Sequence, residues 1–402
     1  MNIPDLLLLS ATVLLCATAF AQNADTGPKV SPEARRIQQS AIVIDTHADT
    51  PGRFVDENFN PSNDAGKGHW DLAKVKEANL GAEFFSIWVD PKKYQGKYVQ
   101  RALDMIDSVY ETTRKHPDQM MMAYSVSDIE RAHQQHKLAS LIGLEGGHAI
   151  DNNIRILRDY YRLGVRYMTL SWANTNEFAD SSGDMDKADV QHHNGLTDFG
   201  KQVVLEMNRL GMLVDISHVA DKTFWDTLAT SKAPVIASHS SSRVVTNHPR
   251  NLTDEMLKAV AKNGGVVQVN FNCGFIDQNY LDAYTKWNQQ RMAQGKADST
   301  YSTEVTPNIP RPPFKSLIDH FDHIAKVAGV DHVGIGSDFD GVDCLPSGID
   351  SVGDLPKITQ ALLDRGYSPD DLQKILGGNL LRVFADAERV SRQMQSDSRQ
   401  QH

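Results

Sequence analysis

Short apolar runs rich in β-branched residues alternate with amphipathic segments along most of the chain. The runs have the length and composition of buried strands and lie at 41–45, 83–89, 139–144, 165–170, 212–216, 234–238, 265–271 and 332–337. The amphipathic segments predict helices at 99–115, 152–163, 196–210, 221–231, 253–263, 316–328, 353–366 and 369–385. Eight strands separated mostly by helices predict an α/β fold, a (β/α)₈ TIM-like barrel.

Several of the predicted strands end in a histidine or a carboxylate, which are residue types that bind metal ions. These strand-end residues are His47, Asp49, Glu145, His218, His239 and Asp338. The C-terminal ends of all strands in a (β/α)₈ barrel open into one mouth, so we expect these side chains to converge there. A doubly wound open sheet would place a site at one switch point, and candidates on five separate strands favour the barrel.

The candidate ligands predict a binuclear metal site at the C-terminal ends of the strands. His47 and Asp49 are two residues apart on a strand, so both side chains can reach one ion. With Glu145, His218 and His239 they make three histidines and two carboxylates, too many for one tetrahedral ion. Two zinc ions, or other divalent ions, bridged by a carboxylate would use all five. Glu145 is the natural bridge because two glycines follow it and allow close approach of the backbone.

Composition and charge narrow the class of function. The 402 residues are 40% hydrophobic and 23% charged, which is ordinary for a globular protein with a large core. The formal net charge of −10 gives no basic surface for nucleic acid or for anionic membranes. We therefore expect a small-molecule substrate and no nucleic-acid partner. The oligomeric state is left open, with a homodimer as one alternative.

The ends of the chain and one internal segment differ from the barrel pattern. Leu6 to Phe20 is apolar but too short to span a bilayer comfortably, and Ala19-Phe20-Ala21 follows the pattern of a cleavage site, so residues 1–21 resemble a secretory signal peptide. Asp5 departs from that pattern, because a basic residue is usual there. Cleavage would leave no transmembrane span in the mature chain, and a bacterial periplasm is the expected location.

The predicted organisation is a polar lead-in at 22–38, a single barrel domain at 39–390 with an inserted excursion or lid at 273–315, and a frayed polar tail at 391–402.

Cysteine usage is sparse. Of the three cysteines, only Cys273 and Cys344 would remain in the mature chain, and neither has the spacing of a metal cluster. An exported protein permits a disulfide between them, but sequence does not fix their geometry, so their pairing is left open.

Several longer stretches, taken in order, resemble one known family across residues 35–390. They are Asp45-Thr-His-Ala-Asp-Thr50, Gly143-Leu-Glu-Gly-Gly-His148, Asp215-Ile-Ser-His-Val219, Ser238-His-Ser-Ser241, Arg250-Asn251, Asp331-His-Val-Gly-Ile-Gly-Ser-Asp-Phe-Asp-Gly341 and Gly377-Gly-Asn-Leu380. In these stretches the chain resembles the membrane dipeptidase (renal dipeptidase) family, zinc peptidases of the metal-dependent amidohydrolase superfamily. The resemblance implies hydrolysis of dipeptides, L,L and also L,D, with the D-residue on the C-terminal side.

The resemblance also implies roles for individual residues. It implies two zinc ions that share one carboxylate, the first bound by His47, Asp49 and Glu145 and the second by Glu145, His218 and His239. Asp338 would lie beside a hydroxide that bridges the ions, take its proton as general base and pass the proton to the leaving amine as general acid. Arg250 would bind the free C-terminal carboxylate of a dipeptide, a task that suits a planar bidentate donor.

One position departs from the family pattern. Where the family commonly has a histidine that contacts the scissile carbonyl, this chain has Trp172, whose indole N–H donates one hydrogen bond but cannot titrate. Stabilisation of the oxyanion would then weaken, or pass to the metals or to Asn174 or Asn176. Trp172 keeps open a second interpretation, a sister binuclear amidohydrolase that acts on N-acyl amino acids, lactones or other amide or ester bonds. A catalytically silent binding protein is a third, but it would be expected to have lost a ligand or Asp338.

Overall fold

The strands form a closed parallel barrel, as the sequence predicts. The computed structural model describes residues 25–295 and 307–400; the predicted signal peptide, residues 22–24 of the lead-in, residues 296–306 of the excursion and the last two residues lie outside these ranges. The barrel strands are β1 (Val43–Ala48), β2 (Leu80–Trp88), β4 (Leu138–Glu145), β5 (Val165–Thr169), β6 (Leu213–Asp215), β7 (Ile236–Ala237), β8 (Val266–Val269) and β9 (Val333–Ile335). Each pairs in parallel with its neighbours, and the β2–β4 and β1–β9 pairings close the ring. The (β/α)₈ prediction is therefore confirmed.

One further strand lies outside the ring. β3 (Met120–Met122) pairs in parallel with residues 138–140 of β4, whereas β5 pairs with residues 142–144 of the same strand. β3 was not predicted from the sequence, because its three consecutive methionines show no alternation of apolar and polar positions.

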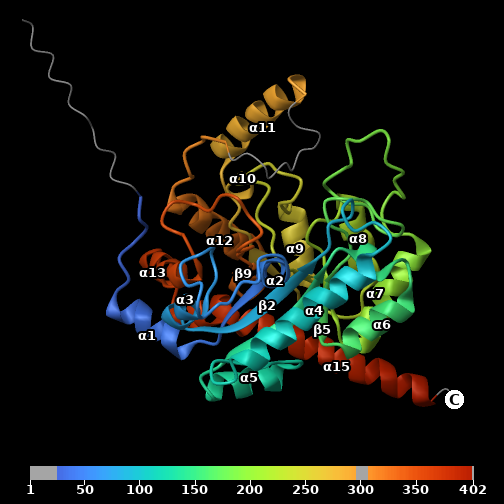
Figure 1. Ribbon diagram of the computed structural model, residues 1–402, viewed down its shortest axis with the longest axis horizontal. Coiled ribbons are helices and arrows are strands. Elements are labelled where there is room, and N and C mark those ends of the chain that lie inside the picture. The colour runs from blue at the N-terminus through green and yellow to red at the C-terminus, as the bar shows by residue number, and fades with distance from the viewer. Residues whose placement is uncertain (1–24, 296–306, 401–402) are drawn as a thin grey trace, which may run out of the picture.

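Helices surround the barrel, as the brightly coloured ribbon of Figure 1 shows. They are α1 (Pro32–Ser40), α2 (Thr50–Asp56), α3 (Leu72–Ala78), α4 (Tyr98–Lys115), α5 (Val126–Gln134), α6 (Ile154–Arg162), α7 (Asp198–Leu210), α8 (Asp221–Thr230), α9 (Asp254–Asn263), α10 (Cys273–Ile276), α11 (Gln278–Ala293), α12 (Phe314–Ala328), α13 (Leu355–Asp364), α14 (Pro369–Gln373) and α15 (Asn379–Gln400). Local sequence fixes many ends: at α9 the Thr253 side chain accepts a hydrogen bond from Met256 N–H, and Gly264 ends the helix at φ +80°.

The structure differs from the predictions at both ends of the chain. The lead-in predicted to continue to residue 38 already forms α1 from Pro32, where the Ser31 side chain accepts from Ala34 N–H. Residues 391–400 of the tail predicted to fray are the last ten residues of α15. Its Ser391 hydroxyl donates to the Arg209 carbonyl at the end of α7, at 2.7 Å. Docking against α7 therefore orders a segment whose polar composition alone predicts disorder.

Neighbouring residues on most of the strands face two separate apolar clusters. Phe84, Leu141, Tyr167, Leu213, Ile236 and Val266 belong to one cluster, together with Ile44, and the residue after each of the first six belongs to the other. The first cluster also contains Leu380, Val383 and Phe384 of α15, which runs beneath the strands in Figure 1. We infer that it fills the barrel interior and that α15 covers one end, leaving the C-terminal ends of the strands for a site.

The predicted excursion begins as two ordered helices. Residues 273–293 form α10 and α11, and α11 projects from the body at the top of Figure 1. Cys273 at the start of α10 forms a disulfide with Cys344, so the pairing that sequence left open is present. Whether this segment acts as a lid stays a prediction.

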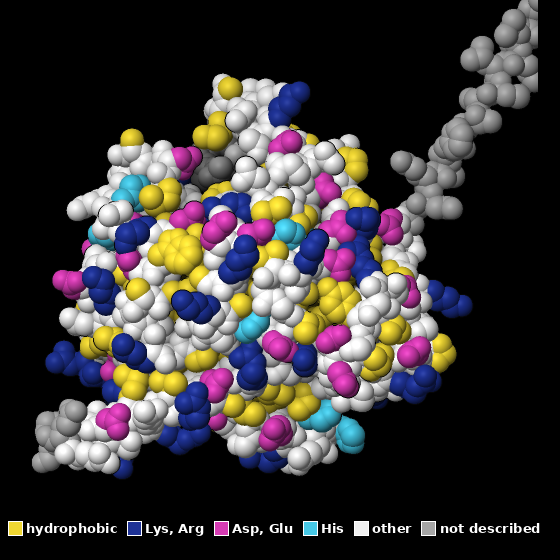
Figure 2. Space-filling model, turned by 180° about the vertical axis from the view of Figure 1, so that it is seen from behind, with side chains coloured by type: hydrophobic (Ala, Val, Ile, Leu, Met, Phe, Trp, Pro, Cys, Tyr) yellow, Lys and Arg dark blue, Asp and Glu magenta, His cyan; other side chains and the backbone are white. Residues whose placement is uncertain are grey.

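The surface carries charges of both signs. On the face shown in Figure 2, Lys and Arg side chains are interspersed with Asp and Glu side chains. Within residues 25–295 and 307–400, no helix is long and apolar enough to cross a bilayer.

His320 on α12 makes the stability of the fold depend on pH. Its Nδ1 accepts from Ser242 N–H at 3.0 Å and its Nε2 lies 3.2 Å from the Ile276 carbonyl. Burial lowers its pKa from 6.5 to about 4, so the neutral ring contributes stability above pH 6.5 that is lost as the pH falls toward 4. We expect this residue to account for about 2 kcal/mol of lost unfolding free energy between about pH 7.5 and about pH 5. Denaturant unfolding of wild type and His320→Gln at both pH values checks this; an equal loss in the two proteins would contradict it.

Candidate active site

The predicted ligands and Asp338 lie at the C-terminal ends of five different strands, as the barrel requires. His47 is the penultimate residue of β1 and Glu145 is the last residue of β4. His218, His239 and Asp338 follow β6, β7 and β9 by two or three residues. The fold thus brings together side chains that are up to 291 positions apart (47 to 338).

Glu145 lies at the centre of the cluster and faces two groups of donors. Its Oε2 is 3.4 Å from His47 Nε2, and that nitrogen is 3.5 Å from Asp49 Oδ2. Its Oε1 is 2.9 Å from His218 Nε2 and 3.4 Å from His239 Nε2. The two carboxylate oxygens therefore point to two different ligand sets, which is the arrangement of a bridging carboxylate.

The spacing and chemistry of these donors fit divalent metal ions. Two ligands that are each about 2.1 Å from a tetrahedral ion lie roughly 3.4 Å apart, close to the separations of 2.9–3.5 Å in this cluster. Among the described residues, His47 Nε2, Asp49 Oδ1 and His218 Nδ1 are buried without a hydrogen-bond partner. A buried polar atom without a partner is costly, and a cation would satisfy the first two. The residues present therefore fit metal binding.

Hydrogen-bond partners occupy Nδ1 of two of the histidines and leave Nε2 of each ring facing the cluster. The Ser238 hydroxyl donates to Asp215 Oδ2 at 2.6 Å, which leaves its oxygen to accept from His239 Nδ1–H at 2.7 Å. His47 Nδ1 lies 2.8 Å from the Tyr167 hydroxyl. The tautomer that carries its proton on Nδ1 keeps the Nε2 lone pair for an ion, and both contacts are compatible with it.

Burial and mutual charge shift the pKa values in the cluster. Burial lowers the pKa of His218 to about 3, with the nearby Arg250 charge acting in the same direction. Burial and the charge of His47 likewise hold the pKa of His239 well below its usual value. Both rings are therefore neutral, the form that binds metal. Burial, with the neighbouring Asp49 and Glu145 carboxylates, raises the pKa of Asp338 to about 8.

The backbone at the site adopts conformations that ordinary loops avoid. His218 and Asp338 lie in the left-handed region, at φ +67° and +66°. Such conformations persist where the surrounding structure imposes them, and they are common at functional sites. Gly146 lies at φ +100°, and a side chain on Gly341 would come within 2.0 Å of Asp49 Oδ2. The glycines after Glu145 and Asp338 thus allow the crowding that the ligands need.

Asp338, rather than the nearby Asp340, faces the ligands. Asp338 Oδ1 is 4.0 Å from His47 Nε2. Asp340 is instead held by the Thr50 hydroxyl at 2.8 Å and by the Arg53 guanidinium at 3.2 Å. Asp340 therefore has a structural role in joining α2 to this loop.

Arg250 is buried beside the second ligand group. Its Nη2 donates to the His239 carbonyl at 3.1 Å, its Nη1 lies 3.3 Å from Ser240 Oγ, and its Cζ is 5.3 Å from the centre of the Phe275 ring. The effect of its charge on the pKa of His218 places the guanidinium within electrostatic range of the ligands. Its role in substrate binding stays a prediction.

Trp172 also lies near the ligands. Its ring centre is 5.0 Å from that of Trp88 at the end of β2 and 6.3 Å from that of His218. Trp88 is paired in register with Glu145. The indole of Trp172 therefore occupies the rim of the site between β2 and β6.

Asn174 and Asn176 differ in what their amides do. Asn176 Nδ2 donates to the Leu170 carbonyl at 2.8 Å, and its Oδ1 accepts from the N–H groups of Phe178 and Ala179, both at 3.0 Å. The Asn174 amide makes one long contact of 3.5 Å to the Thr175 carbonyl. Asn176 thus holds its own loop together, and a substrate role would require it to give up these bonds.

This difference gives a prediction for the two amides. Asn176→Ala should lower the free energy of unfolding by about 1–3 kcal/mol because it leaves buried backbone groups without partners. Asn174→Ala should change it by no more than about 0.5 kcal/mol. Denaturant unfolding measures both, with steady-state rates alongside. A large loss of kcat in Asn176→Ala at unchanged stability would contradict the structural role.

The residues that orient the ligands were not predicted from the sequence. Tyr167 and Ser238 hold histidines, Ser86 Oγ donates to Glu145 Oε2 at 3.2 Å, and Asn270 donates to Asp338 at 2.8 Å. For Tyr167, the alternation of side chains along its strand could have indicated that it faces the barrel interior. Asn270 directly follows an apolar run, as the ligands do, and that position could have marked it as a site residue.

A family profile and a relative of known name both liken this chain to dipeptidases. The profile of the family described as membrane dipeptidase (peptidase family M19) matches residues 31–398. The protein "Dipeptidase 3" of Rattus norvegicus is 32% identical over 373 residues, which cover 90% of this chain and 68% of that protein.

Solved structures extend the likeness to three dimensions. The probable dipeptidase PvdM from Pseudomonas aeruginosa has a TM-score of 0.79 and 25% identity, covering 89% of this chain and 98% of its own. A metallo peptidase from Rhodobacter sphaeroides is liganded with a phosphinate mimic of the dipeptide L-Ala-D-Ala. It has a TM-score of 0.71 and 25% identity, and the match covers 86% of this chain and 99% of the metallo peptidase. Both likenesses therefore extend over most of this chain.

Proposed function

Since the chain belongs to the membrane dipeptidase family, peptidase family M19, it is a metal-dependent peptide-bond hydrolase that acts on dipeptides, and we propose that it cleaves both L,L- and L,D-dipeptides using two zinc ions. The observation that carries this proposal is the position of Glu145 between two groups of nitrogen and oxygen donors. Neutral imidazoles and carboxylates suit zinc, although manganese or cobalt would fit the same donors.

The residues on each side of Glu145 would hold one ion each. His47 and Asp49 would share the first with Glu145, and His218 and His239 would share the second. When bound, such ions polarise the scissile carbonyl and lower the pKa of the attacking water. Tyr167 and Ser238 would keep His47 and His239 in the required tautomer.

Asp338 would carry the proton. Its Oδ1 faces His47, and burial raises its pKa to about 8, so the carboxylate is a base of suitable strength near neutral pH. It would take a proton from the attacking water and give it to the leaving amine. The strained backbone at Asp338 would fix the direction of this carboxylate.

Arg250 would bind the C-terminal carboxylate of the substrate. Its planar guanidinium can bind a carboxylate through two parallel hydrogen bonds, so a free C-terminus directly after the scissile bond would be required. The L-Ala-D-Ala mimic in the Rhodobacter sphaeroides structure supports a D-residue at that position.

A second candidate function follows from Trp172. The indole lies at the site rim where a titratable donor is usual in the family, so a sister activity on N-acyl amino acids or other amide and ester bonds is the alternative. An N-acyl amino acid also ends in a carboxylate, so for that substrate the two functions differ in whether the enzyme requires a free amino group.

Export to the bacterial periplasm is part of the proposal. A disulfide such as the one between Cys273 and Cys344 is typical of proteins in oxidising compartments. Together with the apolar run at Leu6 to Phe20, it supports secretion of the mature chain.

A substrate panel with one variant tests the function. We expect the zinc-loaded protein to hydrolyse L-Ala-L-Ala and L-Ala-D-Ala, and to cleave their C-terminal amides and N-acetyl-Ala-Ala poorly. Arg250→Met should lower kcat/KM for the free dipeptides by about 100-fold because a carboxylate loses its charged partner. The same change should leave the slow rate on the amides within about threefold, since they have no carboxylate to lose.

The amides thus serve as an internal control for folding and metal binding. Equal losses on acids and amides would contradict the carboxylate role of Arg250. Turnover of the N-acetyl substrate without turnover of free dipeptides would instead establish the alternative function.

A further inference from the structure

We infer that Asn270 is a positioning residue for Asp338, and that the Cys273–Cys344 disulfide keeps together the two loops that carry this pair. The inference rests on the proposed function, because it assumes that Asp338 moves the proton. Asn270 is the first residue after β8 and is fully buried, and Asp338 follows β9, the neighbouring strand of the barrel.

One hydrogen bond gives the two carboxylate oxygens of Asp338 different surroundings. Asn270 Nδ2 donates to Asp338 Oδ2 at 2.8 Å, while Oδ1 faces His47 Nε2 at 4.0 Å. The carboxylate is therefore held at one oxygen and presented to the ligands with the other. Rotation about χ2 would move both oxygens away from these positions, and Asn270 opposes that rotation.

The orientation of the Asn270 amide is itself determined. Its Oδ1 accepts from Asn272 N–H at 2.6 Å, and only an oxygen can accept this bond. The NH₂ group must therefore point to Asp338. Asn272 in turn accepts from Gly274 N–H at 2.8 Å, which fixes the start of α10.

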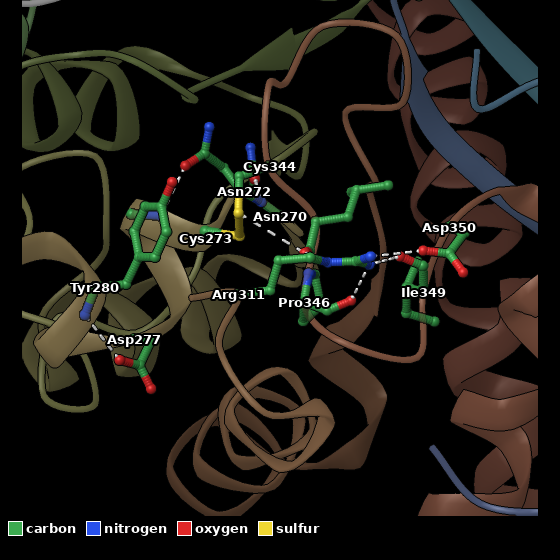
Figure 3. The surroundings of a disulfide bond; sticks show 12 residues. Asn270, Asn272, Cys273, Asp277, Tyr280, Arg311, Cys344, Pro346, Ile349 and Asp350 are labelled. Atoms are coloured by element: carbon green, nitrogen blue, oxygen red, sulfur yellow. Dashed lines mark hydrogen bonds and ion pairs between the residues drawn. A yellow bond between two sulfur atoms is a disulfide. The ribbon is translucent and has the colours of Figure 1, made fainter. Parts of the chain in front are cut away.

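The disulfide joins the same two loops a few residues further along. Cys273 is three residues after Asn270, and Cys344 is six residues after Asp338. Figure 3 shows the S–S bond beside Asn270 and Asn272. Next to it, Cys273 N–H donates to the Cys344 carbonyl at 3.1 Å. The covalent link thus limits how far the two loops can separate.

Packing and one arginine hold the loop after Asp338 from the other side. Phe271 and Phe339 meet edge to face at 5.7 Å. Arg311 donates to the carbonyls of Leu345 and Pro346, each at 2.7 Å, as the dashed lines in Figure 3 indicate for the Arg311 side chain. These contacts would hold the loop in place without the disulfide, so removing the disulfide alone should loosen the Asn270–Asp338 pair and not unfold the loop.

Two substitutions at Asn270 test the positioning role. Asn270→Leu removes the amide donor and keeps a similar side-chain volume. Asn270→Ala removes the donor and most of the side-chain volume. We expect each to lower kcat for L-Ala-L-Ala by about 10- to 100-fold, with KM within about threefold of wild type and with unchanged metal content by elemental analysis. A kcat within twofold of wild type in Asn270→Leu, or a rise in KM at constant kcat, would overturn the role.

A double-mutant cycle tests the part of the disulfide. The variant Cys273→Ser/Cys344→Ser should lose about three- to tenfold in kcat through a loosened carboxylate. Asn270→Ala added to that variant should then lower kcat by a smaller factor than it does in the wild type, because both changes act through one hydrogen bond. Equal factors in the two backgrounds would show independent effects and overturn the link.

The outcomes separate this inference from the proposed function. A wild-type protein that cleaves no dipeptide contradicts the function itself. A wild-type protein that cleaves dipeptides, with Asn270 variants that match it, contradicts only the positioning role.

Discussion

Asp338→Asn should lower kcat for free dipeptides by about 10²- to 10⁴-fold, the range that a positioned general acid–base supplies. Asparagine keeps the shape of the side chain, and its oxygen can still accept from Asn270, at present 2.8 Å from Asp338 Oδ2. The amide cannot accept a proton from water or deliver one to an amine. The loss should therefore appear in kcat, with KM changed little.

The matched control is Asp340→Asn, two residues further along the same loop. The Asp340 carboxylate is held by Thr50, Arg53 and the His69 N–H. This substitution should lower the melting temperature and leave kcat within about tenfold. Metal content must be measured in both variants, because Asp338 lies in one group of potential ligands with His47 and Asp49. A kcat for Asp338→Asn within tenfold of wild type, with metal bound, would exclude the proton-transfer role.

The barrel could be predicted from sequence because its strands and their connections follow local rules. Runs of apolar β-branched residues marked all eight barrel strands, and the helices α4, α6, α7, α8, α9, α12 and α13 lie within a few residues of their predicted positions. Parallel topology then requires that strand ends meet, so ligands such as His47 and Asp338 could be grouped from the sequence alone.

The missing elements depend on tertiary contacts. α2 and α3 have seven residues each, too short to be stable alone, and α2 is held through the Arg53–Asp340 pair. The predicted helix at 369–385 is divided by a π-helical turn at Lys374–Gly378. A side chain on Gly377 in that turn would come within 2.1 Å of the Ile42 carbonyl, so only glycine permits the close approach to β1.

The orienting residues were missed for a related reason. Tyr167 and Asn270 lie on or after apolar strands and carry no motif of their own, so their function depends on which side chain stands opposite. Register between strands determines that, and register is a property of the whole barrel. Asn176 shows the same limit: sequence could not reveal that its amide is bonded to its own loop, and its predicted substrate contact stays a prediction.

Glu145→Gln should have the largest effect of all, because Glu145 contacts three histidines of the cluster. The amide is neutral and can present only one oxygen to the two ligand groups. We expect the loss of at least one ion and a fall in kcat/KM of about 10³-fold or more, equivalent to about 4 kcal/mol of transition-state stabilisation. Elemental analysis after dialysis, titration calorimetry with zinc and steady-state rates measure the two effects separately.

The control for this substitution is Glu83→Gln. Glu83 is also fully buried on a neighbouring strand, where its Oε2 accepts from Trp70 Nε1–H at 3.1 Å. Burial raises the pKa of Glu83 well above its usual value, which favours the neutral carboxyl, so glutamine is a close replacement in shape and charge. Glu83→Gln should keep both the metal and the activity. Because both variants exchange a buried carboxyl for an amide, any difference between them measures what charge and bridging contribute at Glu145. If Glu145→Gln bound zinc as tightly as Glu83→Gln, the carboxylate would not be a ligand, and the binuclear site would have to be rejected.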